Sequence, residues 1–419
     1  MNIYFDNAST TPLLLYGDDI LGNPSSPHGL GIAAERKLTD ARAAIAKILN
    51  CNPAEITFTS GGTESNNLAL LGFAMANRRK DVTFMAQPWE HPSILEPLKF
   101  IKNQSLANVL IAPYQEWKNC KSELRLAATS HVNHETGDIN DIAAVAATLK
   151  KDNHHTTILV DGVQGFCKET ANLTGIDMYT FSAHKCHGPT GTGGLMARSN
   201  VRLLPLLHGG GQENKLRPGT ENVHGILRMA NISSKLWSKQ ADNHIHTAKI
   251  KTKLAELASE LPNTTINFKE NTSPYILNMS FLGVKGEILV HVLSERGIYV
   301  SMGAACRSRK NTKTALEKMI LSASGWRGIF SIDENEEGRS AEISEPYRII
   351  AGGASMVFAE YMQFAVKSND LPSEKKVVLL GCDTRPTGKA IAEPIIRVLL
   401  SLGCEVRYAG VIAAPQIMA

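Results

Sequence analysis

The sequence lacks the features of a membrane, secreted or metal-binding protein. No apolar run in its 419 residues reaches the roughly 20 residues that a transmembrane helix needs. Residues 1–7 lack the basic and apolar regions of a signal peptide. The seven cysteines are odd in number, widely spaced and never arranged as C-x-x-C, so neither a zinc site nor a disulfide framework is expected. These absences favour a cytoplasmic protein with reduced thiols and no bound metal.

Strong charge of either sign is also lacking. The net charge is +4 and is scattered along the chain, which is too little to indicate nucleic-acid binding. Hydrophobic residues make up 43% and charged residues 20%, the composition of an ordinary globular protein. A chain of 419 residues is long enough for two or three domains.

Alternating strand and helix patterns predict an α/β fold for the first half of the chain. Apolar residues at helical spacing predict a helix that ends near Asn50. Such an alternation is typical of an open, mostly parallel sheet that binds its ligand at the carboxyl ends of the strands. The expected strands are 56–59, 82–85, 124–128 and 157–160, and the expected helices include 68–73 and 139–150.

A run of small residues, 60–67, joins one of these strands to a helix. It reads Ser-Gly-Gly-Thr-Glu-Ser-Asn-Asn. A strand, a glycine turn and a helix start together offer free backbone N–H groups and a positive dipole end to an anion. The alternative is an ordinary helix capped by Thr63 or Ser65, because glycine pairs are common at such turns.

Lys185 lies between two histidines in the stretch 181–194, ahead of a glycine-rich run. The preceding strand is closed by Asp161 and Gln164. A lysine amine can form a Schiff base with the aldehyde of pyridoxal phosphate (PLP), and an acid at a strand end can pair with its pyridinium nitrogen. A surface lysine in a glycine-rich turn is the alternative. Every candidate site residue lies at the end of an expected strand, which favours a PLP-binding lysine over a surface lysine.

The second half of the chain predicts a smaller α+β domain. After the polar loop 208–220, the segment 223–260 is mainly helical. A strand at 275–281, a helix at 286–296 and a strand at 298–301 then lead into a loop that contains Cys306.

The chain resembles the cysteine desulfurases, which belong to the class V group of PLP fold-type I enzymes. The matching motifs occur in the family's order over roughly residues 1–318. They are residues 6–12, 22–28, 59–67, 90–91, 131–133, 161–164, 182–185 and 303–306.

The resemblance implies a domain plan. A large PLP-binding domain with a mostly parallel sheet would span 12–225. A smaller α+β domain would span 226–318, with 1–11 as an N-terminal extension.

The resemblance also implies roles for individual residues. Lys185 would hold PLP, Asp161 would pair with the ring nitrogen, and Gln164 would approach the phenolic oxygen. His91 would stack on the ring and move protons. The phosphate would be held by Gly62, Thr63, Ser182 and His184. Thr220 would reach the cofactor phosphate of a second subunit, so a homodimer is expected.

Cys306 is the expected nucleophile in the reaction that the resemblance implies. L-cysteine would become L-alanine and leave a persulfide on Cys306, for transfer through an acceptor or scaffold protein to iron–sulfur cluster assembly or tRNA thiolation. Small residues precede Cys306, and Arg307, Arg309 and Lys310 follow it, which favours a mobile loop and the reactive thiolate. Cys186, held in the turn beside Lys185, is its closest rival. We expect four of the other cysteines to be small buried apolar side chains: Cys51, Cys167, Cys382 and Cys404.

The chain departs from the family at several positions. His134 stands where the family usually has a second asparagine near the PLP phenolic oxygen; imidazole can also donate a hydrogen bond there. The segment 13–21 is too short for the family's first helix, and 302–305 replaces a serine-rich run. The family's later arginine, which binds the substrate carboxylate, has no match. Two alternatives therefore stay open: a fused or truncated chain that binds PLP but turns over poorly, and a class V transaminase or selenocysteine lyase.

From Met319 onward the chain resembles the start of a phosphohexomutase, that is, of a phosphoglucomutase or phosphomannomutase. The segment 377–388 matches that family's strand and turn, and a helix at 390–402 and a strand at 405–408 complete a β-α-β unit. The acidic stretch 333–343 is expected to be an exposed connection. The resemblance thus implies a partial α/β module at 319–419, which ends before the family's phosphoserine loop and metal aspartates and is expected to have no mutase activity.

Overall fold

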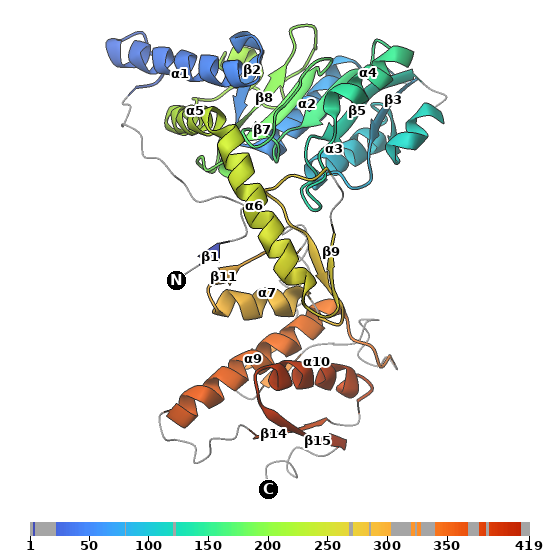
Figure 1. Cartoon of the computed structure of the whole chain (residues 1–419). Coiled ribbons are helices and arrows are strands. Elements are labelled where there is room, and N and C mark those ends of the chain that lie inside the picture. Colours follow the sequence, from blue (N-terminus) through green and yellow to red (C-terminus); the bar gives the residue numbers. More distant parts are fainter. Residues whose placement is uncertain are drawn as a thin grey trace. The chain divides into compact units, whose positions relative to one another are not determined.

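The computed structural model divides the chain into two compact units (Figure 1). One unit is residues 6–282, and the other combines 1–5 with 283–419. The three-part division expected from the sequence, with boundaries after 225 and 318, stays a prediction. The structure describes residues 3–4, 22–79, 81–119, 123–267, 271–284, 286–302, 320–322, 325–327, 340–367, 377–382 and 385–411.

The larger unit is built on a seven-stranded sheet of order β2-β8-β7-β6-β5-β3-β4. Strand β8 pairs antiparallel with both of its neighbours, and the other pairs are parallel. The predicted, mostly parallel sheet is therefore confirmed. The strands are β2 (Ile56–Thr59), β3 (Val82–Ala86), β4 (Asn108–Ile111), β5 (Glu123–Ser130), β6 (Thr157–Asp161), β7 (Met178–Ser182) and β8 (Gly193–Ala197).

Helices cover both faces of this sheet (Figure 1). On one face, α1 (Gly29–Ile48), α4 (Ile142–Asp152) and α5 (Val223–Ser238) pack Ile45 and Ile226 against Tyr179. On the other face, α2 (Gly62–Ala76) and α3 (Pro92–Asn103) pack Phe73 and Ile94 with Phe84. Every residue of β3, β6 and β7 is buried, because a parallel sheet between two helical layers has no solvated face.

Short 3₁₀ helices occur in several connections of the larger unit. They are η2 (Pro53–Glu55) before β2, η3 (Tyr114–Asn119) between β4 and β5, η4 (Ala183–Lys185) directly after β7, and η5 (Glu213–Lys215) between β8 and α5. The helix expected at 139–150 begins only at Ile142, because Asp141 caps it by accepting from Ala144 N, while Ile139 pairs with Val132 in an isolated bridge.

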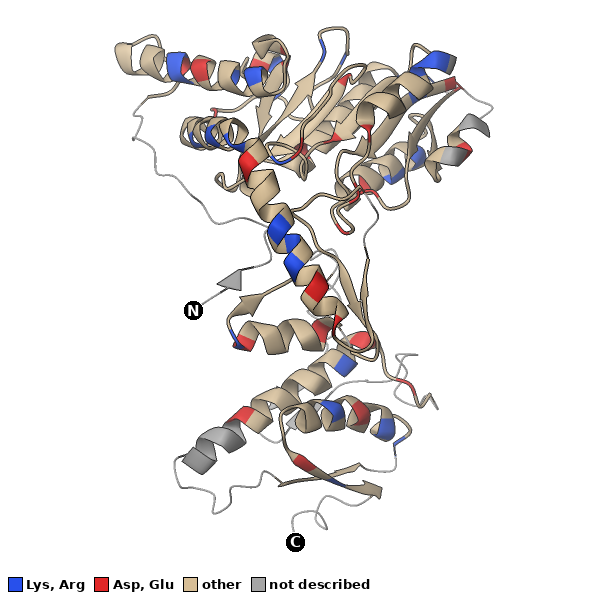
Figure 2. Ribbon diagram, viewed as in Figure 1, with Lys and Arg blue, Asp and Glu red and all other residues tan. Residues whose placement is uncertain are grey.

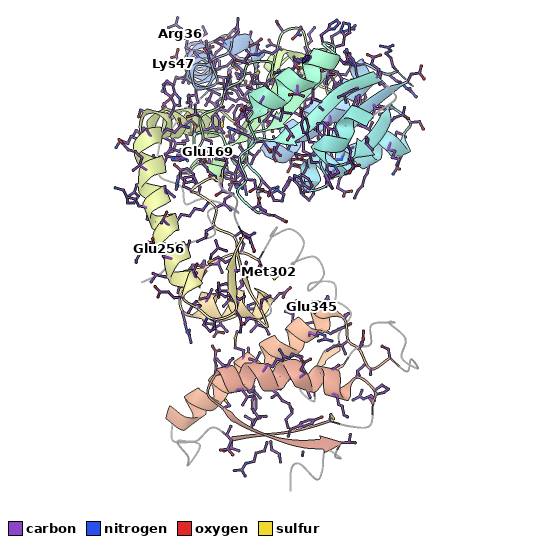
Figure 3. The ribbon with its side chains drawn as sticks, turned by 45° about the vertical axis from the view of Figure 1, so that its right-hand side comes forward. Arg36, Lys47, Glu169, Glu256, Met302 and Glu345 are labelled. Atoms are coloured by element: carbon purple, nitrogen blue, oxygen red, sulfur yellow. The ribbon has the colours of Figure 1, made fainter. Side chains whose placement is uncertain are left out.

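Helix α6 (Gln240–Ser259) and the antiparallel strands β9 (Thr264–Ile266) and β10 (Met279–Phe281) complete the larger unit. Figure 2 shows basic and acidic residues along the same helix α6. The strand predicted at 275–281 is too long, since only β10 is extended and paired. The segment before β10 and helix α6 both contact Glu169, which is labelled in Figure 3. Glu169 accepts from Ser273 Oγ at 2.5 Å and lies 3.2 Å from His244 Nε2 on α6.

The described part of the smaller unit contains three separate two-stranded sheets. Strand β1 (Ile3–Tyr4) pairs parallel with β11 (Ile298–Tyr299), next to helix α7 (Gly286–Glu295). Strand β14 (Val377–Cys382) pairs parallel with β15 (Glu405–Val411). Helix α10 (Gly388–Ser401) connects this pair, and α9 (Glu345–Lys367) packs on α10, so the predicted β-α-β unit is present. A short hairpin joins β12 (Ile320–Ser322) and β13 (Gly325–Arg327).

No helix among the described residues is long and apolar enough to cross a membrane. Of the expected acidic connection, 333–343, only residues 340–343 fall within the described ranges.

Candidate active site

Lys185 lies at the carboxyl end of β7, in the turn that returns the chain to β8. Ser182 ends the strand, and Lys185 closes the one-turn helix η4. The turn is tight: Ala183 N donates to Thr192 O at 3.0 Å, and Gly188 N donates to Ala183 O at 2.9 Å. A Cβ on Gly188 would approach Ala183 Cβ to 2.8 Å, so this position needs glycine. Lys185 is therefore half-buried, and its backbone is held in a rigid turn.

Asp161 ends the neighbouring strand β6 and is buried, with 7% of its surface exposed. Each of its carboxylate oxygens accepts a hydrogen bond. Val163 N donates to Oδ1 at 3.0 Å, and Asn66 Nδ2 donates to Oδ2 at 2.8 Å. A buried carboxylate without such donors would be costly, so these contacts hold the side chain in one orientation.

His91 caps helix α3 just beyond β3. Its Nδ1 accepts from Ser93 N at 3.1 Å and lies 2.8 Å from Ser93 Oγ. Burial lowers the pKa of His91; Lys185 adds to this effect, whereas Asp161 opposes it. The structure thus brings His91 into electrostatic contact with both Asp161 and Lys185, as a neutral imidazole at pH 7.

His134 joins His91 at this end of the sheet. The two ring centroids are 5.0 Å apart, with an interplanar angle of 81°. His134 Nε2 also lies 3.8 Å from the carboxylate of Glu135. The residue that departs from the family pattern is therefore in edge-to-face contact with the predicted stacking histidine.

An anion cradle lies at the start of α2, directly after β2. Gly61 has φ 154° and ψ −177°, a backbone conformation open to glycine alone. Ser182 Oγ is buried without a hydrogen-bond partner among the described residues. A Cβ on Gly61 would lie 3.6 Å from this oxygen, so the hydroxyl faces the helix start. An unpartnered hydroxyl beside a helix N-terminus is chemically suited to a phosphate. The roles expected of Gly62 and Thr63 stay a prediction.

Gln164 is oriented by a buried lysine that the sequence did not single out. Lys168 Nζ donates to Gln164 Oε1 at 3.0 Å, and the two residues are 9% and 5% exposed. Because an ammonium group only donates, the amide oxygen must face Lys168 and the amide NH₂ the opposite side. Burial lowers the pKa of Lys168 to about 8. The side of Gln164 away from Lys168 is thus a donor, which suits a phenolic oxygen.

His184 is half-buried in η4, next to Lys185. Burial, together with the positive charges of Lys185 and Lys168, lowers its pKa to about 4. A neutral imidazole can both donate and accept, so His184 can bind a phosphate oxygen without adding a charge.

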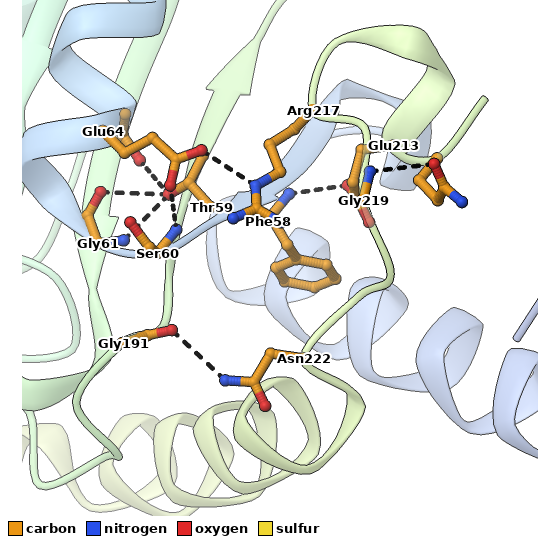
Figure 4. A network of polar contacts seen from close by, with 12 residues as sticks. Phe58, Thr59, Ser60, Gly61, Glu64, Gly191, Glu213, Arg217, Gly219 and Asn222 are labelled. Carbon is orange, nitrogen blue, oxygen red and sulfur yellow. Dashed lines mark hydrogen bonds and ion pairs between the residues drawn. The ribbon is translucent and has the colours of Figure 1, made fainter. Parts of the chain in front are cut away.

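The loop that carries Thr220 is fastened to the cradle by Arg217 (Figure 4). Arg217 Nε donates to Glu64 Oε1 at 3.0 Å, and Glu64 Oε2 accepts from Ser60 N at 2.7 Å. Burial would raise the pKa of Glu64, but the Ser60 and Arg217 hydrogen bonds lower it overall. Thr220 itself is exposed.

A small, partly open pocket lies between this loop and the glycine turn. Glu213, Arg217 and Glu221 bring charge to its wall. The other lining residues are Phe58, Thr59, Ser60, Gly191, Asn222 and Ile226.

Cys306 and its basic neighbours lie outside the described residues, as does the motif at 6–12. Among the described cysteines, Cys186 is 1% exposed, and its Sγ lies 3.3 Å from Ala183 O. Cys167 and Cys404 are buried as predicted. Cys51 and Cys382 are only half-buried, so that prediction was wrong for them.

Three buried side chains of the site were not identified from the sequence. Asn66 lies within the motif at 59–67 and Glu90 within the motif at 90–91, but neither was given a role. Ser93 follows His91 by two residues. Glu90 is 3% exposed, and Ser130 and Gln87 interact with its carboxyl group, which by themselves would lower its pKa. Burial chiefly, and Asp161 in addition, raises the pKa of Glu90 to about 8. Its position between a strand end and His91 was the one available signal.

No group of three or more metal-ligating side chains occurs in the part of the chain that the structure describes.

Comparisons with known proteins match both parts of the chain. The family described as aminotransferase class-V matches residues 3–329. The family described as phosphoglucomutase/phosphomannomutase, alpha/beta/alpha domain I, matches residues 319–419. Cysteine desulfurase IscS 1 of Archaeoglobus fulgidus is 32% identical over 347 residues, which cover 77% of this chain and 88% of that protein.

Solved structures match the part of the chain that resembles the desulfurases. A NifS-like protein has a TM-score of 0.68 and 34% identity, covering 72% of this chain and 88% of its own. SspA in complex with cysteine has a TM-score of 0.63 and 27% identity, covering 74% of this chain and 91% of its own. Together, the family and structure matches confirm both resemblances predicted from the motifs and the predicted α/β fold.

Proposed function

The chain belongs to the class-V aminotransferases, in the branch that contains the cysteine desulfurases, and we propose that it converts L-cysteine into L-alanine with Cys306 as sulfur acceptor. The C–S bond of the substrate breaks, and its sulfur forms an S–S bond with Cys306. The displaced thiol proton balances the proton gained at the carbon that becomes the methyl group of alanine. Cys306 is left as a persulfide.

The observation that carries this proposal is the electrostatic contact of His91, beyond the end of β3, with Asp161 at the end of β6 and Lys185 after β7, at the same edge of the sheet as the start of α2. Enzymes of this family depend on PLP. Here Lys185 would hold the aldehyde carbon, Asp161 the ring nitrogen, and Gln164 and His134 the phenolic oxygen. The phosphate group would be held by Gly62, Thr63, Ser182 and His184. PLP, when bound, supplies an electron sink for the bonds of the substrate carbon.

The chain's own residues supply the positioning and proton transfers. The Lys185 amine would take the α-proton of the substrate. His91 offers a donor at Nε2, because its Nδ1 is occupied by Ser93. Glu90, protonated at neutral pH through its raised pKa of about 8, adds no second negative charge beside Asp161. The thiolate of Cys306 attacks the substrate sulfur.

A homodimer is part of the proposal. The exposed Thr220 would reach the cofactor phosphate of a second subunit, with its loop fixed by the Arg217–Glu64 pair. A sulfur-acceptor or scaffold protein would then take the persulfide sulfur to iron–sulfur cluster assembly or tRNA thiolation in the cytoplasm. A related structure in complex with cysteine supports the substrate.

Persulfide formation provides the test. The PLP-loaded protein is incubated with L-cysteine, and alanine release and the mass of the Cys306 peptide are measured. We expect Cys306→Ser to keep the visible cofactor absorption and its change on adding cysteine, but to form no persulfide. Cys186→Ser is the matched control and should retain sulfur release. The reverse result would show that the wrong nucleophile has been assigned.

The same assay separates the alternatives. Alanine formation that requires a keto acid would indicate a transaminase, and a cofactor-loaded protein without alanine release would indicate a poorly active chain.

A further inference from the structure

Asn66 is fully buried on α2, and each polar atom of its side chain has a partner. Its Nδ2 donates to Asp161 Oδ2 and to Ser93 Oγ, both at 2.8 Å. Its Oδ1 accepts from Thr180 Oγ1, also at 2.8 Å. Rotating the amide by half a turn would place its oxygen against the Asp161 carboxylate, so the orientation is fixed by chemistry. Asn66 thus connects α2, α3, β6 and β7 through one side chain.

Ser93 passes this orientation on to His91. Its Oγ accepts from Asn66, which leaves the hydroxyl proton for His91 Nδ1, 2.8 Å away. Ser93 N donates to the same Nδ1 at 3.1 Å. With two donors directed at Nδ1, the proton of the neutral imidazole must be on Nε2. The tautomer of His91 is therefore set by Ser93.

We propose that Asn66 is a positioning residue that joins Asp161 and His91 into one hydrogen-bonded unit and, through Ser93, keeps His91 neutral with its proton on Nε2. The network itself is independent of the reaction, and only the roles of Asp161 and His91 within it rest on the proposed function. Asn66 touches neither substrate nor cofactor in this scheme.

Physical chemistry gives the direction of the effect on His91. Protonation at Nδ1 would direct a new N–H at the two Ser93 groups that donate to this atom. Because donors would then face a donor, these contacts disfavour the imidazolium. This effect adds to burial, the largest cause of the lowered pKa of His91. The charged groups facing the ring are Asp161 and Glu135, which raise its pKa, and Lys185, which lowers it. The edge of His134 completes its surroundings.

The experiment follows the titration of His91 by NMR in full-length protein with ¹⁵N-labelled histidine, with the His91 signal identified by its loss in His91→Gln. Ser93→Ala removes one of the two donors, so we expect the His91 pKa to rise by about one pH unit. Asn66→Ala should also raise it, because the Ser93 hydroxyl is then free to turn away. Asn67→Ala is the matched control: this neighbouring side chain bonds to Thr63 O instead, and His91 should titrate as in the wild type.

A second readout separates the two links of the network. PLP binding to the cofactor-free protein is measured by fluorescence titration. Asn66→Ala should raise the PLP dissociation constant several-fold, since Asp161 loses its Oδ2 donor, whereas Ser93→Ala should leave it within about twofold. The inference is overturned if His91 titrates as wild type in Ser93→Ala, or if the two variants weaken PLP binding equally. If Asn66→Ala does not fold, the Ser93→Ala titration decides alone. Neither readout needs turnover, so loss of the desulfurase assignment would leave this result standing.

Discussion

Arg42 on α1 and Glu213 in η5, 171 residues later, form a two-pronged ion pair. The Nη1–Oε2 distance is 2.9 Å and the Nη2–Oε1 distance is 2.6 Å. Glu213 also accepts from Phe58 N at 2.8 Å, and Arg42 donates to Ile56 O at 2.6 Å. The pair therefore ties α1 and the edge strand β2 to the loop that carries Arg217 and Thr220. The positive φ of 49° at Glu213 indicates that these contacts hold a strained backbone in place.

Replacement of Glu213 should destabilise the protein and not only the loop. Glu213→Ala leaves the amide of Phe58 without an acceptor and leaves the guanidinium of Arg42 with Ile56 O but no carboxylate partner. We expect a loss of about 3 kcal/mol in the free energy of unfolding. Chemical denaturation measures this loss. The exposed pair Glu96–Lys99 is the control, since Glu96→Ala should cost no more than about 0.5 kcal/mol. Equal effects of the two substitutions would contradict the structural role of Glu213.

Lys168 should impose a pH dependence on stability. Its pKa is lowered from 10.5 to about 8, so the unfolded chain binds more protons at this residue between those two pH values. The free energy of unfolding therefore gains from Lys168 as pH rises from 8 to 10.5, by about 3 kcal/mol at most. Lys168→Met should remove this gain and flatten the measured stability curve above pH 8. The same variant frees the amide of Gln164, so its PLP affinity should also fall.

Glu90 should make the free energy of unfolding fall as pH rises, which is the opposite of the effect of Lys168, and it should do so at lower pH. Its pKa is raised from 4.5 to about 8, so here the folded state binds more protons than the unfolded chain. Its contribution to stability is fully present below pH 4.5 and is lost as pH rises to 8. Glu90→Gln keeps the shape without the titration. Relative to the wild type, this variant should gain stability between pH 5 and pH 8, and denaturation curves at the two pH values would show no such gain if Glu90 were ionised in the fold.

The fold could be predicted from the sequence because its signals are local, whereas the roles assigned to Lys185 and Asp161 stay predictions. Buried strands of a parallel sheet are short apolar runs. Asp161 is the last residue of one such strand, and Lys185 closes the short helix that follows another. The strand expected at 275–281 failed, because an apolar run does not show where pairing stops.

The supporting residues of the site could not be predicted, because their importance depends on contacts between distant segments. Asn66 meets Asp161 across 95 positions and Thr180 across 114. Lys168 looks like any surface lysine until the fold shows that it is buried against Gln164. Burial and sheet order, which no short window of sequence contains, turn such residues into parts of a site.

The glycine turn before α2 allows a test of how closely the cradle is built. A Cβ on Gly62 would overlap with Cγ2 of Val163, the residue whose N–H donates to Asp161 Oδ1. Gly62→Ala should therefore displace Val163 and disturb both the cradle and Asp161, which we expect to weaken PLP binding about tenfold. The double variant Gly62→Ala/Val163→Ala removes the overlap and should recover most of the affinity in a fluorescence titration. Recovery would show that Gly62 is required for space, whereas a double variant as weak as Gly62→Ala would mean that the backbone conformation at the helix start decides binding.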